Sequence, residues 1–276
     1  MRYSLHLTNN CNLRCTYCYE DGKEDKNYKH FVISPEEADR RLQSIIADGQ
    51  CAELELLGGE IFLYPEIVKY IFVNYHKYFS WLITTNGTVR NAEIDGLIAQ
   101  YKPFIGVSLD DPQTINLQRI GIDFDRVLAN AKYWRTLTTV GIAAVITPLN
   151  IHRLKETFDF YILEHNFRII HFGCVEEWMN DYYWEVYKQE TARLIENTEP
   201  AILREVHISP WKQHSVSKKE FIYEDGIEKV EIFNPAKMDL SAYNEAKYAG
   251  YCLYCKKIGV EPLPPIPAGV ELVTQK

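Results

Sequence analysis

The chain of 276 residues has no apolar run of about eighteen residues and no N-terminal signal pattern of basic, apolar and small residues. The first absence excludes a membrane-spanning helix, and the second argues against export. Cysteine is scarce and odd in number, with seven thiols that cannot all pair with one another. A secreted disulfide framework is therefore not expected, and we predict a cytoplasmic protein with reduced thiols.

Basic residues are outnumbered, because 30 Lys and Arg stand against 38 Asp and Glu, for a net charge of -8. Sequence-independent nucleic-acid binding relies on Lys and Arg meeting phosphates. We therefore expect no nucleic-acid partner and consider a basic peptide or a small molecule a better match. Apolar residues make up 46% of the chain, enough for a sizeable core, and the length suits one α/β barrel with an appendage.

Six short apolar segments alternate with helical patterns as far as residue 174. These expected strands cover residues 3–7, 54–57, 81–85, 104–109, 142–147 and 169–172. Most are continuously apolar, which is typical of a parallel sheet that is covered on both faces. The consecutive right-handed βαβ units form either an open doubly wound sheet or a barrel.

The segments between these strands carry helix signals. Ser34, Pro35 and Glu37 supply an N-cap, a proline at the first helical position and a capping-box glutamate. Further helices are expected to open at Pro65 and after Asn91, and over the apolar stripes near residues 124–131 and 154–162.

The pattern changes after residue 175. One helix is expected near residues 182–197, followed by a hairpin whose strands, 220–223 and 227–233, are joined across Asp225-Gly226. A Cys252-x2-Cys255 pair and a Pro-rich tail complete the chain. We therefore predict a core domain over residues 1–174 and a C-terminal extension over residues 175–276.

Three of the seven cysteines, Cys11, Cys15 and Cys18, fall within eight residues directly after the first expected strand. Thiolates are ligands for zinc and for iron–sulfur clusters. Three thiols on one loop can hold three corners of a [4Fe–4S] cluster and leave one iron open to a cofactor. A zinc site would need a fourth ligand from elsewhere. The carboxyl end of a strand is where parallel α/β folds build their active sites.

The spacing C-x3-C-x2-C, with the aromatic Tyr17 before the third cysteine, resembles the signature of radical S-adenosylmethionine (SAM) enzymes. The resemblance implies a (β/α)6 partial TIM barrel in which the amino and carboxylate groups of SAM chelate the open iron. It also implies reductive cleavage of SAM to methionine and a 5′-deoxyadenosyl radical, which abstracts a hydrogen atom from the substrate. The implied electron donor is a one-electron carrier such as flavodoxin or ferredoxin.

Later motifs, each at the end of an expected strand, extend the resemblance over roughly residues 1–174. In LLGGE, two glycines allow close backbone approach, and the turn resembles the motif that meets the SAM amino group. The positions that the resemblance implies for SAM binding are Gly58, Gly59, Glu60, Thr85, Asn86, Ser108, Asp110, Arg119, Ile146 and Thr147. Arg119 is the candidate for the SAM carboxylate, and an ordinary solvated arginine is the alternative.

The other cysteines leave several interpretations open. Cys252 and Cys255 could supply half of a metal site. The pair forms an auxiliary iron–sulfur cluster with Cys174 and a non-thiol ligand, holds zinc, or has no metal role. Cys174, at the end of the sixth expected strand, is alternatively a hydrogen-atom donor to a substrate radical or a small buried side chain. Cys51, just before the second strand, is expected to be structural.

Relatives with an SLDG-type segment, similar to GVSLDD here, include many that modify ribosomal peptides. We therefore predict modification of a ribosomally synthesised peptide by hydrogen abstraction, through a crosslink, a thioether or epimerisation. The alternatives are a radical SAM enzyme for an amino acid, sugar or nucleoside, and a non-catalytic metal-binding module. Because the sequence begins at the first expected strand, we expect a leader peptide to bind the barrel side, the C-terminal third or a separate protein.

Overall fold

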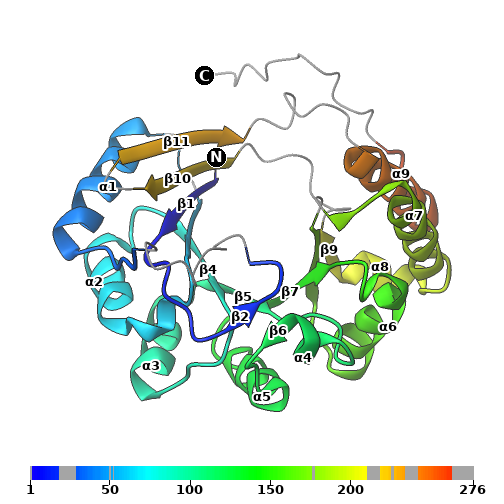
Figure 1. Ribbon diagram of the computed structural model, residues 1–276, viewed down its shortest axis with the longest axis horizontal. Helices are drawn as coiled ribbons and strands as arrows, with labels where there is room; N and C mark the ends of the chain where they lie inside the picture. Colours follow the sequence, from blue (N-terminus) through cyan, green and yellow to red (C-terminus); the bar gives the residue numbers. More distant parts are fainter. Residues whose placement is uncertain are drawn as a thin grey trace. The chain divides into compact units, whose positions relative to one another are not determined.

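A computed structural model describes residues 2–18, 29–49, 51, 53–175, 178–209, 218–224, 227–233 and 242–262 (Figure 1). By its internal contacts the chain forms two compact units. Unit 1 consists of Met1–Leu109, Ile115–Gly141 and Ser217–Phe233, and unit 2 of Asp110–Thr114, Ile142–Val216 and Asn234–Lys276. The domain boundary expected after residue 174 stays a prediction.

Unit 1 is built on strands in the order β11-β10-β1-β3-β4-β5. They are β1 (Arg2–His6), β3 (Glu53–Leu57), β4 (Ser80–Thr85), β5 (Phe104–Ser108), β10 (Lys218–Glu224) and β11 (Ile227–Phe233). Neighbours are parallel, except that β10 and β11 pair antiparallel as the predicted hairpin strands. The turn predicted at Asp225-Gly226 lies outside the described residues. The parallel pairing of β10 with β1 was not predicted.

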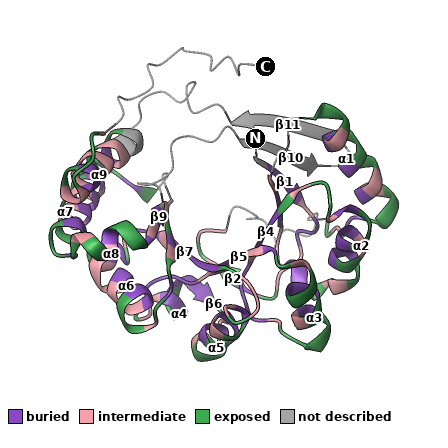
Figure 2. Ribbon diagram, turned by 180° about the vertical axis from the view of Figure 1, so that it is seen from behind, coloured by how far each residue is buried: buried purple, intermediate pink, exposed green. Residues whose placement is uncertain are grey.

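The predicted crossover helices of unit 1 are present. They are α1 (Pro35–Asp48), α2 (Pro65–Tyr75), α3 (Ala92–Tyr101) and α5 (Phe124–Trp134). The side chains of Ser34, Asn91 and Asp123 cap α1, α3 and α5 by accepting backbone N–H groups of the first turn. Figure 2 shows buried residues along the strands and exposed residues on the outer sides of the helices.

The two faces of the unit 1 sheet differ in chemistry because side chains alternate along a strand. Leu54 and Leu56 are fully buried and lie beside the equally buried Tyr3 and Leu5 of β1. The opposite face is polar, since Glu55 accepts hydrogen bonds from Ser4 Oγ at 3.1 Å and from Thr84 Oγ1 at 2.7 Å.

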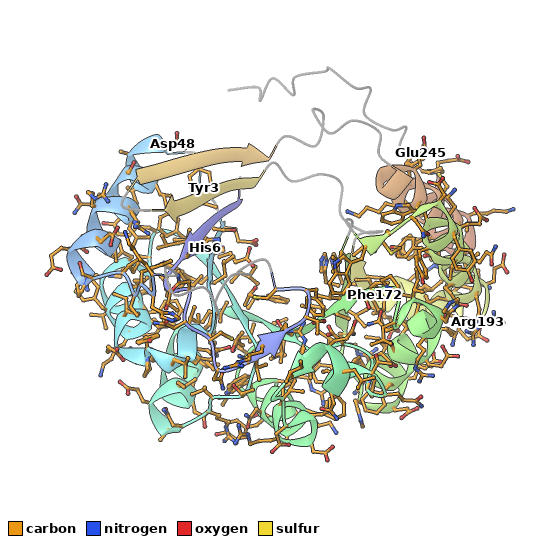
Figure 3. The ribbon with its side chains drawn as sticks, in the orientation of Figure 1. Tyr3, His6, Asp48, Phe172, Arg193 and Glu245 are labelled. Atoms are coloured by element: carbon orange, nitrogen blue, oxygen red, sulfur yellow. The ribbon has the colours of Figure 1, made fainter. Side chains whose placement is uncertain are left out.

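Strand β1, which lies between β10 and β3, is also tied to α1. The hydroxyl of Tyr3 donates to the carboxylate of Asp48, the last residue of that helix (Figure 3). Burial, with the nearby carboxylate as a second cause, raises the pKa of Tyr3 above its ordinary value. The phenol therefore stays protonated and keeps this hydrogen bond.

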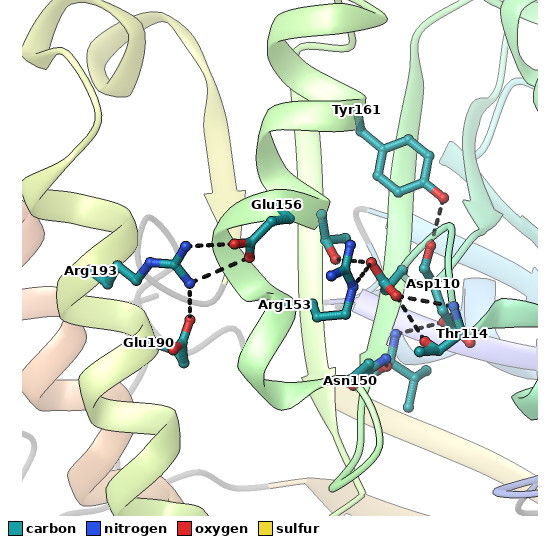
Figure 4. Close-up of polar contacts among 11 residues, drawn as sticks. Asp110, Thr114, Asn150, Arg153, Glu156, Tyr161, Glu190 and Arg193 are labelled. Atoms are coloured by element: carbon teal, nitrogen blue, oxygen red, sulfur yellow. Dashed lines mark hydrogen bonds and ion pairs between the residues drawn. The ribbon is translucent and has the colours of Figure 1, made fainter.

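Unit 2 contains β7 (Val140–Ile146, from Ile142 onward), β8 (Ile169–Cys174) and β9 (His207–Ser209), all parallel. Its helices are α6 (Leu154–Phe158), which continues as a π-helical segment over Asp159–Glu164, α7 (Asp181–Glu196), α8 (Pro200–Glu205) and α9 (Ala242–Ile258). Arg193 of α7 bridges Glu156 of α6 at 2.5 Å and Glu190 at 3.0 Å (Figure 4). Among the described residues, none of the helices combines the length and apolar character that crossing a bilayer requires.

Candidate active site

The loop that leaves β1 carries Cys11, Cys15 and Cys18, which form no disulfide bond and are of intermediate exposure. The amide of Leu13 donates to Cys11 Sγ at 3.4 Å, and the amide of Cys18 donates to the carbonyl of Cys15 at 3.2 Å. An amide that donates to sulfur, as that of Leu13 does, orients a metal-binding thiolate and tunes it. Within the described part of the chain, no three His, Cys, Asp or Glu side chains are arranged to hold a metal ion. The ligand role of the three thiols therefore stays a prediction.

A two-residue antiparallel ladder, β2 (Arg14–Cys15) with β6 (Arg119–Ile120), holds the middle of the thiol loop. Cys15 pairs with Arg119, whose Nη1 lies 3.9 Å from Cys15 Sγ. The Arg119 guanidinium is also 5.4 Å from the centroid of the Tyr17 ring. Since Arg119 is only 6% exposed, its interpretation as a solvated arginine is wrong.

The Gly58-Gly59-Glu60 turn after β3 lies against the thiol loop. The amide of Gly59 donates to the carbonyl of Thr8 at 2.7 Å, and the amide of Glu60 to that of Asn10 at 2.7 Å. A Cβ at either glycine would overlap a carbonyl oxygen, that of Thr8 at Gly58 and that of Asn10 at Gly59. These glycines therefore let the turn reach the backbone of the thiol loop.

Glu60 is fully buried and joins this turn to the next one. Its carboxylate accepts the amide of Phe62 at 3.0 Å, the Thr85 hydroxyl at 2.8 Å and the Asn86 amide at 2.7 Å. Burial raises the pKa of Glu60, and the three hydrogen bonds oppose that rise. The predicted residues Glu60, Thr85 and Asn86 thus meet in one place, and the carboxylate holds two loops in register.

Asn86 extends this network to the thiols. Its Nδ2 donates to Cys11 Sγ at 3.5 Å and to Asn12 Oδ1 at 2.9 Å, while Asn12 Nδ2 donates to Thr88 Oγ1 at 2.8 Å. Thr88 in turn donates to Asn86 Oδ1 at 2.6 Å. Asn12 and Thr88 were not predicted, although Asn12 lies within the cysteine motif and Thr88 within TTNGT.

The predicted residues that follow β5 and β7 have structural contacts of their own (Figure 4). Asp110 is fully buried, and its Oδ1 accepts the amide of Val145 at 2.9 Å while its carbonyl accepts the Tyr161 hydroxyl at 2.6 Å. The amide of the buried Thr147 donates to Asn150 Oδ1 at 2.8 Å. Ser108, the last residue of β5, is half-buried in unit 1.

The adjoining Asp111 was not predicted as a site residue. Its carboxylate forms an ion pair with Arg153 at 2.9 Å and accepts the Thr114 hydroxyl at 3.0 Å. The side chain of Asp111 is 1% exposed, so this pair fixes the loop after β5 from within.

The remaining cysteines are dispersed. Cys174 is the last residue of β8 and pairs with the buried Ile146 of β7, and by strand alternation it shares a face with the buried Phe172 (Figure 3). Cys252 and Cys255 lie on successive turns of the continuous helix α9, and Cys255 is buried. The hydrogen-donor and auxiliary-ligand roles of these residues stay predictions.

Cys51 fits its predicted structural role. Its thiol donates to the carbonyl of Glu53 at 3.3 Å. Burial raises the pKa of Cys51 to about 11.

Comparisons with known proteins identify a family and several relatives that this chain resembles. The family model described as "Radical SAM superfamily" matches residues 5–161. The chain is 30% identical over 112 residues to the antilisterial bacteriocin subtilosin biosynthesis protein AlbA of Bacillus subtilis, covering 39% of this chain and 23% of that protein. It is 27% identical over 212 residues to a cysteine-type anaerobic sulfatase-maturating enzyme of Clostridium perfringens, covering 68% of this chain and 56% of that enzyme.

A third relative belongs to a different substrate class. A Methanocaldococcus jannaschii protein named "Probable GTP 3',8-cyclase" is 24% identical over 265 residues, covering 92% of this chain and 79% of that protein. The chain thus spans about half or less of the length of the first two relatives and most of the third.

Two solved structures share the fold. The structure of anSMEcpe with bound AdoMet superposes with a TM-score of 0.62 at 20% identity, covering 76% of this chain and 61% of that one. Streptococcus suis SuiB bound to its precursor peptide SuiA gives 0.60 at 18% identity, covering 80% of this chain and 57% of that one. The likeness confirms the predicted fold class, the α/β partial TIM barrel.

Proposed function

The chain belongs to the radical SAM superfamily, and we propose that it modifies a ribosomally synthesised peptide by hydrogen abstraction. Membership makes the chain a SAM-dependent iron–sulfur enzyme, so the non-catalytic metal-binding module is wrong. When bound, the [4Fe–4S] cluster and SAM supply one electron and a 5′-deoxyadenosyl radical. The residues of this chain bind and orient these groups.

We assign the cluster to Cys11, Cys15 and Cys18. The donor set fits, because three thiols on one loop leave a fourth metal corner open. The amides of Leu13 and of the Asn86 side chain are directed at Cys11 Sγ, as is usual for thiolates that carry a cluster.

We assign the SAM carboxylate to Arg119 and the SAM amino group to the turn of Gly58 and Gly59. A buried guanidinium beside the thiols suits an anionic group. The Glu60 carboxylate is already engaged by three donors, so we assign it the positioning of the turn. The other positions taken from the family resemblance keep their proposed roles: Tyr17, Thr85, Asn86, Ser108, Asp110, Ile146 and Thr147.

The observation that carries the peptide substrate is the sequence similarity to two relatives whose names refer to peptide or protein maturation. AlbA is named for bacteriocin biosynthesis, and the Clostridium perfringens enzyme for sulfatase maturation. The net charge of -8 is favourable for a basic peptide. The electron donor in this proposal is a flavodoxin or ferredoxin, and the reaction takes place in the cytoplasm.

A small-molecule substrate is the second candidate. The relative named as a GTP 3',8-cyclase aligns with 92% of this chain, more than either peptide-related protein does. A nucleoside triphosphate is therefore the specific competitor to a peptide.

The test is to incubate the reduced, reconstituted protein with SAM and either a short peptide encoded beside it or GTP. The proposal predicts 5′-deoxyadenosine together with a peptide that has lost two hydrogen atoms, or that has unchanged mass in water and takes up solvent deuterium. The first outcome means a new bond and the second means epimerisation. A product from GTP, with the peptide left unchanged, would show that the substrate is the nucleotide and not the peptide.

A further inference from the structure

A cavity of about 460 Å³ lies between the neighbouring helices α1 and α2 of unit 1 (Figure 1). Its volume is within the range of roughly 300–1,000 Å³ that is usual for ligand sites. Residues of α1, of α2 and of the turn after α2 line it, and none of the described residues that do so is a lysine, an arginine or a histidine.

The cavity is a groove between two rows of side chains. The rows are Asp39, Gln43 and Ala47 on α1, and Tyr70, Asn74 and Tyr78 on α2 and the following turn. Residues four apart form one ridge along a helix. From Asp39 to Ala47 the helix rises ~12 Å. That length accommodates about three or four residues of an extended peptide, at roughly 3.3 Å each. We call this cavity the tyrosine groove.

Asp39 is the charged side chain in the lining of the tyrosine groove. Its Oδ1 accepts the hydroxyl of Tyr75 at 2.7 Å, and its Oδ2 accepts the hydroxyl of Tyr70 at 2.8 Å. A carboxylate has about four acceptor positions, so two hydroxyls do not fill it. In the part of the chain that the structure describes, Asp39 forms no ion pair. Asp39 therefore offers a charged acceptor to a cationic donor.

The three tyrosines supply neutral aromatic walls. Burial, followed by the hydrogen bond to Asp39, raises the pKa of Tyr75 to about 12, and the bond to Asp39 also raises the pKa of Tyr70. Both phenols therefore stay protonated. Tyr78 is 57% exposed, and its ring centroid lies 6.2 Å from that of Tyr75. Aromatic faces of this kind attract a cation.

The charges next to the tyrosine groove do not neutralise Asp39. The exposed Glu36 is close enough to interact electrostatically with Asp39. Arg40 follows Asp39 in the sequence but pairs with Glu37 at 3.7 Å. Lys77, beside Tyr78, is exposed and does not line the groove. An incoming cation thus meets a carboxylate without a competing cation in the lining.

We propose that the tyrosine groove binds an arginine side chain of the peptide substrate, outside the segment that is modified. This rests on the proposed function, in which the substrate is a ribosomally synthesised peptide. A guanidinium presents a planar fork of donors to a carboxylate and stacks on aromatic rings, whereas the ammonium of lysine is a compact point charge. Arginine therefore matches Asp39 and the tyrosine rings better than lysine does.

The position of the tyrosine groove agrees with binding outside the modified segment. α1 begins two residues after Ile33, whose amide donates to the carbonyl of Leu7 at 2.9 Å, just before the thiol loop. Asp39 lies in the second turn of α1, near this end of the helix, and Asp48 at the other end holds Tyr3 of β1. The groove therefore runs along the helix layer from the end where the thiol loop starts. A peptide anchored in it extends from there toward the thiol loop.

The experiment measures modification of the short peptide encoded beside this chain by the anaerobically reconstituted holoenzyme, with two small competitors. Acetylarginine amide carries the guanidinium, and acetylcitrulline amide has the same shape with an uncharged urea. The variants are Asp39→Asn and Tyr78→Ala. The control is Asp125→Asn, which removes one exposed carboxylate from the first turn of α5 and changes the net charge equally. The cluster absorbance of each variant checks its folding.

We expect Asp39→Asn to raise KM for the peptide about tenfold and Tyr78→Ala to raise it about threefold. In both variants kcat stays within about twofold of wild type, because the groove holds the substrate away from the reacting atoms. Millimolar acetylarginine amide raises KM in wild type and has no effect on Asp39→Asn, while acetylcitrulline amide has no effect on either protein. Asp125→Asn behaves as wild type.

An unchanged KM in both Asp39→Asn and Tyr78→Ala would overturn the proposal, as would equal competition by the two amides. A loss confined to kcat would also overturn it, since a remote anchor acts on binding. A wild-type holoenzyme that leaves the peptide unmodified would instead refute the proposed function. Direct binding of acetylarginine amide to wild type and Asp39→Asn, measured by saturation-transfer NMR, then still decides whether the groove holds a guanidinium.

Discussion

The three loop thiols differ in their hydrogen bonds, yet each is needed if they share one cluster. Cys15→Ala leaves two ligands on the loop, so we expect loss of the reduced [4Fe–4S] resonance and of 5′-deoxyadenosine formation. Electron paramagnetic resonance and chromatography of the reduced protein measure both. Cys51→Ala is the matched control, because Cys51 lies outside the thiol loop, just before β3, and its thiol donates to the carbonyl of Glu53. A normal cluster signal in Cys15→Ala would contradict the assignment.

Cys51 itself allows a test of burial. Because burial raises its pKa to about 11, the reactive thiolate is a minor species at neutral pH. We expect its alkylation by iodoacetamide to rise about tenfold for each pH unit between pH 7 and 9, without a plateau. Mass spectrometry of the peptide that contains Cys51 measures the rate. A plateau near pH 8.5, as for an ordinary thiol, would show that the side chain is not buried.

Glu60 offers a test of the link between two loops. Glu60→Gln presents an amide N–H to a site where three donors converge, so one buried donor loses its partner. We expect a loss of roughly 1–3 kcal/mol in the free energy of unfolding, measured with urea. Thr85→Val removes a single donor and serves as the comparison. If both variants lose the same amount, the carboxylate does not hold the loops together.

At the scale of the elements, the glycine pair between β3 and the next helical turn determines how closely the thiol loop approaches. Gly59→Ala places a methyl group on the carbonyl of Asn10, so the loop must move. We expect a loss of at least about 2 kcal/mol in unfolding free energy and a lower cluster content after reconstitution.

Gly96→Ala is the control for that substitution. Gly96 lies inside α3, with nothing within 4 Å of an added Cβ. Alanine there should stabilise the helix by about 0.5–1 kcal/mol. Thermal and urea unfolding measure the unfolding free energy of both variants. An equal change in Gly59→Ala and Gly96→Ala would mean that the turn at Gly59 accommodates a methyl group.

The strands and crossover helices were predictable because their signals are local. Largely apolar runs define β4 and β5, and the caps at Ser34 and Asn91 begin α1 and α3 where expected. The pairing of β10 with β1 was not predictable, since the two strands are far apart in sequence and their register is set by tertiary contacts. The ladder of β2 and β6 is too short, at two residues a strand, to leave a periodic pattern.

The site shows the same division. Of the predicted residues, the Gly58-Gly59-Glu60 turn, Asn86 and Arg119 lie against the thiol loop. The sequence predicted neither the partners of these side chains nor the part played by Asn12 and Thr88. The Glu60 carboxylate faces backbone amides and a hydroxyl instead of solvent, and Arg119 faces Cys15. Such contacts depend on loops from different strands meeting in space, which no single segment of sequence encodes.

For the molecule as a whole, the positions of the cysteines predict how many clusters one chain carries. Cys11, Cys15 and Cys18 lie on one loop, where backbone rearrangement can bring sulfur atoms together. Cys252 and Cys255 instead lie in the continuous helix α9, and Cys255 is only 1% exposed. A regular helix holds such a pair in fixed positions, and any further ligands must come from other elements.

We therefore expect about four iron atoms per chain after reconstitution, where two [4Fe–4S] clusters would give about eight. The double variant Cys252→Ala/Cys255→Ala should keep this iron content, because in this prediction the two thiols pack within α9 and bind no metal. Cys15→Ala should lose the iron. Elemental analysis of iron and zinc on the same samples measures both metals. A wild-type content near eight iron atoms that falls to four in the double variant would establish an auxiliary cluster. Zinc that is lost with the same two thiols would establish a structural zinc site in its place.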